Sequence, residues 1–115
     1  MKPSKSQSRL KPVFAEVFDT IQERKRAMPD NSYVASLLRV GPNAILCKVM
    51  EEAGEVVKAI REQKKDQQVY ELCDLFFHTM VLMAAQDISL EEVEQELARR
   101  HGISGLEEKT ARKKG

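Results

Sequence analysis

The stretch from Leu72 to Ala85 constrains the fold of this chain more than any other part of its sequence. It reads LCDLFFHTMVLMAA, and its polar side chains are Asp74, His78 and Thr79. It does not alternate between apolar and polar residues, as a half-exposed strand does. A helix that is apolar on nearly all sides is buried in a bundle or in an oligomer. The sequence therefore predicts an all-α protein with a buried helix from about Gln67 to Gln86.

Apolar residues recur at helical spacing in other segments as well. We expect helices from Val13 to Met28, from Ser32 to Val40 with Ser32 as cap, from Ala44 to about Gln63 behind an Asn43 cap, and from Ser89 to about Arg100, where Glu92 completes a capping box. Strand patterns and internal repeats are missing from the sequence. We therefore predict a helical bundle that is completed by oligomerisation. One domain over residues 13–101 would lie between a flexible tail, 1–12, and a C-terminal tail, 102–115.

Size and charge exclude several functional classes. The 115 residues suit one domain, and 19 basic against 18 acidic side chains leave a formal net charge of +1. That balance argues against nucleic-acid and membrane-surface partners. No apolar run approaches the roughly 20 residues that cross a bilayer. The two cysteines, Cys47 and Cys73, have no metal-finger spacing, so we expect a reduced, cytoplasmic protein.

Two groups of carboxylates carry the chemistry in this sequence. The first is EEAGE, with Glu51, Glu52 and Glu55, in which Glu52 lies at the edge of the apolar stripe of its helix. The second is Glu71 and Asp74, which share one side of the apolar helix with His78. Burying carboxylates costs several kcal/mol per ion unless a partner compensates the charge.

A divalent cation is the partner that these acids predict. No lysine or arginine lies between Glu71 and Arg99, and Lys48 is the nearest cation on the preceding helix. Packing the two long helices together would gather four or five carboxylates, which repel one another unless a cation holds them. Oxygen ligands favour Mg²⁺, with Mn²⁺ as a substitute. Acid pairs at this spacing are also common on solvated helix faces, and a histidine such as His78 is more often a hydrogen-bonded core residue than a metal ligand.

Taken together, EEAGE and ELCD resemble the ExxE…ExxD signature of the all-α nucleoside triphosphate pyrophosphohydrolases. The flanking segments GPNAILCKVMEEAGEVVKA, YELCDLFFHTMVLM and RRHGISGLEEK are similar to the phosphoribosyl-ATP pyrophosphohydrolase family. The resemblance covers roughly residues 14 to 112. Val34 and Met50 depart from the family pattern, at positions where Thr and Gly are expected. These departures lie beside the acids and not among them.

The resemblance implies Mg²⁺-dependent hydrolysis of phosphoribosyl-ATP to phosphoribosyl-AMP and pyrophosphate in a cytoplasmic homo-oligomer, most simply a dimer. It implies the metal ligands Glu52, Glu55, Glu71 and Asp74, and a water oriented by Glu51 or Glu55. Substrate contacts would come from Lys48, His78, Arg24, Lys25, Ser32 and Tyr33. Two alternatives stay open: a house-cleaning dNTP pyrophosphohydrolase that uses the same acids, and a non-catalytic helical dimerisation module.

Overall fold

The computed structural model describes residues 12–101 and residue 109, and over this part of the chain it contains helices and no strands. The helices are α2 (Val13–Ala27), α3 (Tyr33–Val40), α4 (Pro42–Glu62), α5 (Lys65–Ala85) and α6 (Leu90–Arg100). The all-α prediction is thus confirmed. The predicted tails fall outside the described residues except at positions 12 and 109. Among the described helices, none is both long enough and apolar enough to span a bilayer.

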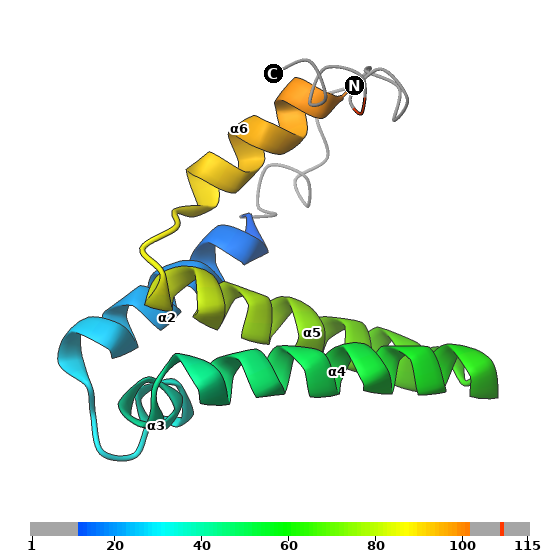
Figure 1. Cartoon of the computed structure of the whole chain (residues 1–115), viewed down its shortest axis with the longest axis horizontal. Helices are drawn as coiled ribbons and strands as arrows, with labels where there is room; N and C mark the ends of the chain where they lie inside the picture. Colours follow the sequence, from blue (N-terminus) through cyan, green and yellow to red (C-terminus); the bar gives the residue numbers. More distant parts are fainter. Residues whose placement is uncertain (1–11, 102–108, 110–115) are drawn as a thin grey trace, which may run out of the picture.

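The two longest helices, α4 and α5, form an antiparallel hairpin (Figure 1). The chain reverses at Gln63 and Lys64, and Gln63 adopts the left-handed conformation at φ 58° that ends α4. In Figure 1, α2 and α3 lie at the end of the hairpin away from this turn, and α6 leads away from it. The hairpin therefore sets residues in the middle of α4 directly beside residues in the first half of α5.

The hydrophobic core lies at the end of the hairpin that α2 and α3 cover. It is built from Phe18, Ile21, Val34, Leu37, Ile45, Met80, Val81, Met83 and Ala84. Burying one large aliphatic side chain of this kind stabilises the fold by about 1.5–3 kcal/mol. The half of the hairpin near the turn is much more open, and its exposed apolar side chains include Val57, Ile60, Val69 and Tyr70.

The helix ends follow the predicted caps with one exception. The Ser32 hydroxyl accepts a hydrogen bond from the Ala35 amide, and Ser89 forms the predicted capping box. The predicted cap at Asn43 is wrong, because α4 already begins at Pro42. Proline suits the first helical position, where its missing amide hydrogen costs nothing. The cap is Gly41. Its φ of 117° is a backbone angle that glycine adopts readily because it has no Cβ.

Candidate active site

Three carboxylates meet where α4 and α5 lie side by side. Glu52 comes from α4, and Glu71 and Asp74 come from α5. Each offers a carboxylate oxygen, and these oxygens all lie within 4.8 Å of one another. Glu52 and Glu71 are buried, with 8% and 7% of their surface exposed, and Asp74 is half-buried. We call these three residues the acid triple.

One lysine stands beside the acid triple. The Lys48 ammonium lies 3.2 Å from a carboxylate oxygen of Glu52 and 3.9 Å from one of Glu51, each roughly one helical turn away. The hydrogen bond to Glu52 raises the pKa of Lys48, so this side chain stays charged. Glu51 itself is exposed. One ammonium facing several carboxylates leaves the site with net negative charge.

Glu55 does not join the acid triple. It is exposed and lines a neighbouring hollow together with Glu71, Lys58 and Gln67. Three of the four predicted metal ligands are therefore brought together, and the fourth opens onto the adjacent hollow. Because Glu55 is exposed, its side chain is free to rotate into another rotamer.

Gln67 is a site residue that sequence reasoning missed. Its amide Nε2 donates a 2.6 Å hydrogen bond to a carboxylate oxygen of Glu71, one turn further along α5. The spacing of four residues is the signal that could have revealed this contact. The bond fixes one Glu71 oxygen, which orients the other.

A hydrogen-bonded chain connects α3 to the acid triple. The backbone oxygen of Asp74 can only accept, so the 2.8 Å contact requires a proton on Nδ1 of His78. In the neutral ring, Nε2 then accepts a hydrogen bond from the Tyr33 hydroxyl, 2.8 Å away. Burial raises the pKa of Tyr33, with a lowering effect from Lys48 and smaller raising effects from Glu52 and Asp74. The Tyr33 hydroxyl therefore lies within the electrostatic field of the site.

The remaining predicted residues lie in two different places. Arg24, Ser32 and Tyr33 line one hollow, between α2 and the start of α3. The Lys25 ammonium is used elsewhere: it donates to the Ala84 backbone oxygen at 2.8 Å and pairs with Asp87 at 2.7 Å. Lys25 thus ties the end of α2 to the end of α5, and the structure does not bring it to the acid triple.

The acid triple suits a hard divalent cation. Its donor atoms are carboxylate oxygens, the ligands that Mg²⁺ and Mn²⁺ prefer. Within the described residues the cluster includes no cysteine or histidine, which softer metals would favour. Three ligands from two rigid helices leave room for substrate oxygens and water around an ion, as magnesium sites require.

Comparisons with known proteins identify relatives over most of the chain. A family model described as phosphoribosyl-ATP pyrophosphohydrolase matches residues 14–101. A protein of Neisseria meningitidis named phosphoribosyl-ATP pyrophosphatase is 51% identical over 100 residues, which make up 87% of this chain and 94% of that protein. Relatives with the same name from Geobacter metallireducens and Chromobacterium violaceum are 50% and 48% identical, over 89% and 88% of this chain and 94% of each relative. The matched region contains the acid triple and all of the described helices except Val13, the first residue of α2.

Proposed function

Because the chain belongs to the phosphoribosyl-ATP pyrophosphohydrolase family, we propose that it hydrolyses phosphoribosyl-ATP to phosphoribosyl-AMP and pyrophosphate, the second step of histidine biosynthesis. The observation that carries this proposal beyond the family match is the acid triple. A negatively charged cluster is a poor site for a triphosphate by itself, because the two repel each other. It becomes a good one when a divalent cation lies between them.

Mg²⁺ is the cation that we propose, with Mn²⁺ able to replace it. Glu52, Glu71 and Asp74 would hold it, and Glu55 would complete the set by rotating in from the adjacent hollow. Bound there, the ion would neutralise charge on the phosphates and the leaving pyrophosphate and make a water molecule more acidic. Gln67 supports this role, since its hydrogen bond holds one oxygen of Glu71.

The chain's own residues would divide the remaining work. Lys48 would bind a phosphate oxygen and stabilise the negative charge of the departing pyrophosphate. Glu51 or Glu55 would orient the water that attacks the α-phosphorus and would accept its proton. The bond from the α-phosphorus to the bridging oxygen then breaks, and pyrophosphate leaves. Exposure of both glutamates supports this role, because each can reach a bound substrate.

His78 and Tyr33 would orient the substrate at the edge of the acid triple. The Tyr33 hydroxyl is held by His78, so it would meet the substrate in a fixed position. Arg24 and Ser32, which line the neighbouring hollow, would contact the part of the substrate beyond the triphosphate. Lys25 as a substrate ligand stays a prediction, and it would require release from Asp87.

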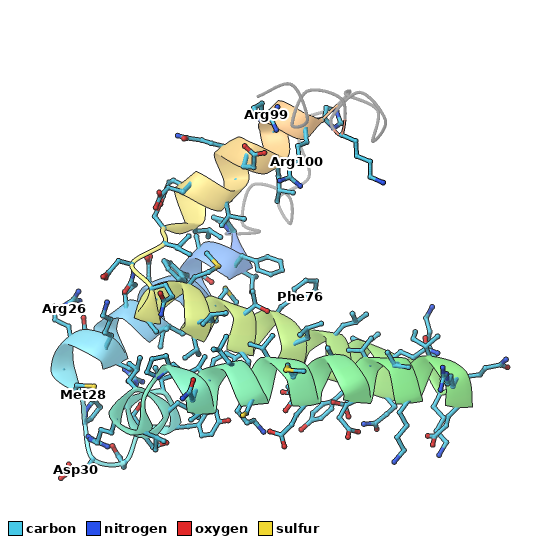
Figure 2. The ribbon with its side chains drawn as sticks, in the orientation of Figure 1. Arg26, Met28, Asp30, Phe76, Arg99 and Arg100 are labelled. Carbon is cyan, nitrogen blue, oxygen red and sulfur yellow. The ribbon has the colours of Figure 1, made fainter. Side chains whose placement is uncertain are left out.

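We also propose that the enzyme is a homo-oligomer, most simply a dimer. Exposed apolar side chains follow helical stripes along both long helices: Leu46, Met50, Val57 and Ile60 on α4, and Val69, Leu72 and Phe76 on α5. Figure 2 shows Phe76 on the side of α5 that faces away from α4. Apolar side chains left exposed along a helix in this way are typical of a protein interface. Two exposed, free cysteines further suit the reducing cytoplasm, where we place the enzyme.

The test is the release of pyrophosphate from phosphoribosyl-ATP, measured with Mg²⁺, with Mn²⁺ and with EDTA, beside a panel of dNTPs. We expect fast, metal-dependent release from phosphoribosyl-ATP and a loss of at least about 100-fold in Asp74→Asn. Asp19→Asn is the matched control, because Asp19 is exposed on α2 outside the site. Turnover of dNTPs in place of phosphoribosyl-ATP would assign the chain to house-cleaning hydrolysis. Failure on every substrate would leave the dimerisation module as its function.

A further inference from the structure

The hollow beside Tyr33 differs in charge from the acid triple. Its polar and aromatic lining comes from Thr20, Arg24, Asn31, Ser32, Tyr33 and Phe77, and none of its lining residues is acidic. Its volume of about 360 Å³ is within the range of small-molecule sites. The hollow at Glu55, in contrast, is lined by three glutamates and two lysines. A hollow with one cation and no acid is suited to an anion.

Arg24 is the cation of this hollow, and its charge is not engaged in an ion pair. The two residues that follow it are both paired: Lys25 with Asp87, and Arg26 with Glu23. Arg24 is exposed, and among the described residues no ion pair or hydrogen bond of its side chain is recorded. A guanidinium presents paired N–H donors that match two oxygens of a phosphate.

The loop that brings Asn31 and Ser32 to this hollow is held in position. Arg39 donates to the backbone oxygens of Met28 and Pro29, at 2.8 Å and 3.2 Å, and so ties down the loop before α3. At the end of this loop, Ser32 accepts a hydrogen bond from the Ala35 amide through its oxygen, which leaves the hydroxyl proton for another acceptor. A preorganised wall costs a ligand less entropy on binding.

Tyr33 forms the boundary between the two sites. Its ring lines the hollow, and its hydroxyl bonds to His78 beside the acid triple. The rings of Tyr33 and Phe77 are nearly parallel, inclined at 22° with centroids 6.4 Å apart, and both line the hollow. Aromatic faces of this kind accept a flat base against them. A ligand that binds both sites must therefore pass Tyr33.

Phosphoribosyl-ATP has the chemical form that this arrangement requires. Its purine carries a triphosphate on one ribose and a single phosphate on a second ribose, so its two anionic ends lie on opposite sides of the base. We propose that the hollow binds the single phosphate of the phosphoribosyl arm, with Arg24 as its anchor, while the acid triple takes the triphosphate. This inference rests on the proposed function and names the group by which the enzyme tells its substrate from ordinary nucleotides, which lack that arm.

The test compares Arg24→Gln with Arg61→Gln, a change of another exposed arginine that lines neither hollow. Loss of one charge-assisted contact predicts a KM for phosphoribosyl-ATP about 10- to 100-fold higher in Arg24→Gln. The preference for phosphoribosyl-ATP over dATP, as a ratio of kcat/KM values, falls by a similar factor. Arg24→Lys recovers part of the loss, because it keeps the charge without the paired donors. Arg61→Gln behaves as wild type.

Ribose 5-phosphate provides a readout that does not need turnover. By calorimetric or NMR titration in EDTA, it binds the wild type at least about tenfold more tightly than Arg24→Gln. Equal binding, or an unchanged preference ratio in an Arg24→Gln variant of normal melting temperature, overturns the assignment of the hollow. A wild type that releases no pyrophosphate from phosphoribosyl-ATP overturns the proposed function instead, so the two failures are distinct.

Discussion

The change Asp74→Asn tests the acid triple through stability, without any assay of turnover. The three carboxylate oxygens lie within 4.8 Å of one another. At that limit, two unit negative charges repel by about 0.9 kcal/mol in water and by about 3.5 kcal/mol at an effective dielectric constant of about 20. Asp74 is half-buried, so we take the lower value. Asparagine removes two such pairs and is nearly isosteric with aspartate. The backbone oxygen that His78 binds is retained.

Asp74→Asn should therefore be more stable than the wild type in EDTA, by about 2 kcal/mol. Since about 1 kcal/mol shifts the melting temperature of a small domain by roughly 4–8 °C, the rise is easily measured by calorimetry. Mg²⁺ should then reduce the difference in stability between the variant and the wild type. At a concentration of about 100 times its Kd, the ion stabilises the wild type by about 2.7 kcal/mol, whereas a tenfold weaker site in the variant gains about 1.4 kcal/mol.

Asp19→Asn is the control for removing one negative charge, and it should follow the wild type at every Mg²⁺ concentration. If Asp74→Asn melted below the wild type in EDTA, the three carboxylates would not repel one another as their distances require. Equal gains with Mg²⁺ in the wild type and in Asp74→Asn would show that the ion binds elsewhere. Either result refutes the metal assignment, whatever the activity of the protein.

Three further predictions follow from local contacts. Lys48→Met should lower kcat/KM by about 100-fold and Lys48→Arg by much less; wild-type turnover in Lys48→Met would show that the lysine only neutralises Glu52. Arg99 and Arg100, at the far end of α6 (Figure 2), lower the pKa of Glu96 from 4.5 to about 2. The ionised Glu96 carboxylate therefore stabilises α6 fully above about pH 4.5, and this stabilisation is lost as the pH falls toward 2. Between pH 5 and pH 2 the melting temperature of Glu96→Gln should therefore fall less than that of the wild type. An equal fall in both proteins would contradict this prediction. Ser89→Ala removes a cap worth about 1 kcal/mol, so hydrogen exchange of α6 amides should quicken about fivefold; unchanged exchange would mean that the capping box seen here contributes nothing.

Local signals in the sequence are sufficient to predict the helices. The Ser32 and Ser89 caps were predictable because a cap is a contact between residues three apart. The start of α4 was not predicted, because Asn43 competes with the Gly41-Pro42 pair and both are acceptable helix starts. After the left-handed turn at Gln63, α5 begins at Lys65, two residues before its predicted start at Gln67. These errors move helix ends and leave the packing of the hairpin unchanged.

The candidate site is predictable only where helical spacing determines it. Asp74 and Glu71 were expected together because residues three apart share a helix face. Whether Glu55 joins the same set depends on how α4 is rotated against α5. That rotation is determined by packing between the helices and not by sequence spacing. The bond between Tyr33 and His78 joins residues 45 positions apart. No local pattern predicts such a contact, and it is the one that links α3 to the acids.

The acid triple and the Arg24 hollow can be separated by experiment because no side chain belongs to both. Asp74→Asn keeps the backbone oxygen that holds His78, and through it Tyr33, so ribose 5-phosphate should bind this variant as it binds the wild type. Arg24→Gln leaves all three carboxylates in place, so Mg²⁺ should raise its melting temperature by the wild-type amount. Because both variants leave the Tyr33–His78–Asp74 hydrogen bonds intact, we expect their effects to be independent. Loss of ribose 5-phosphate binding in Asp74→Asn would instead mean that both phosphorylated ends compete for the acids, and the enzyme would then have one anion site and not two.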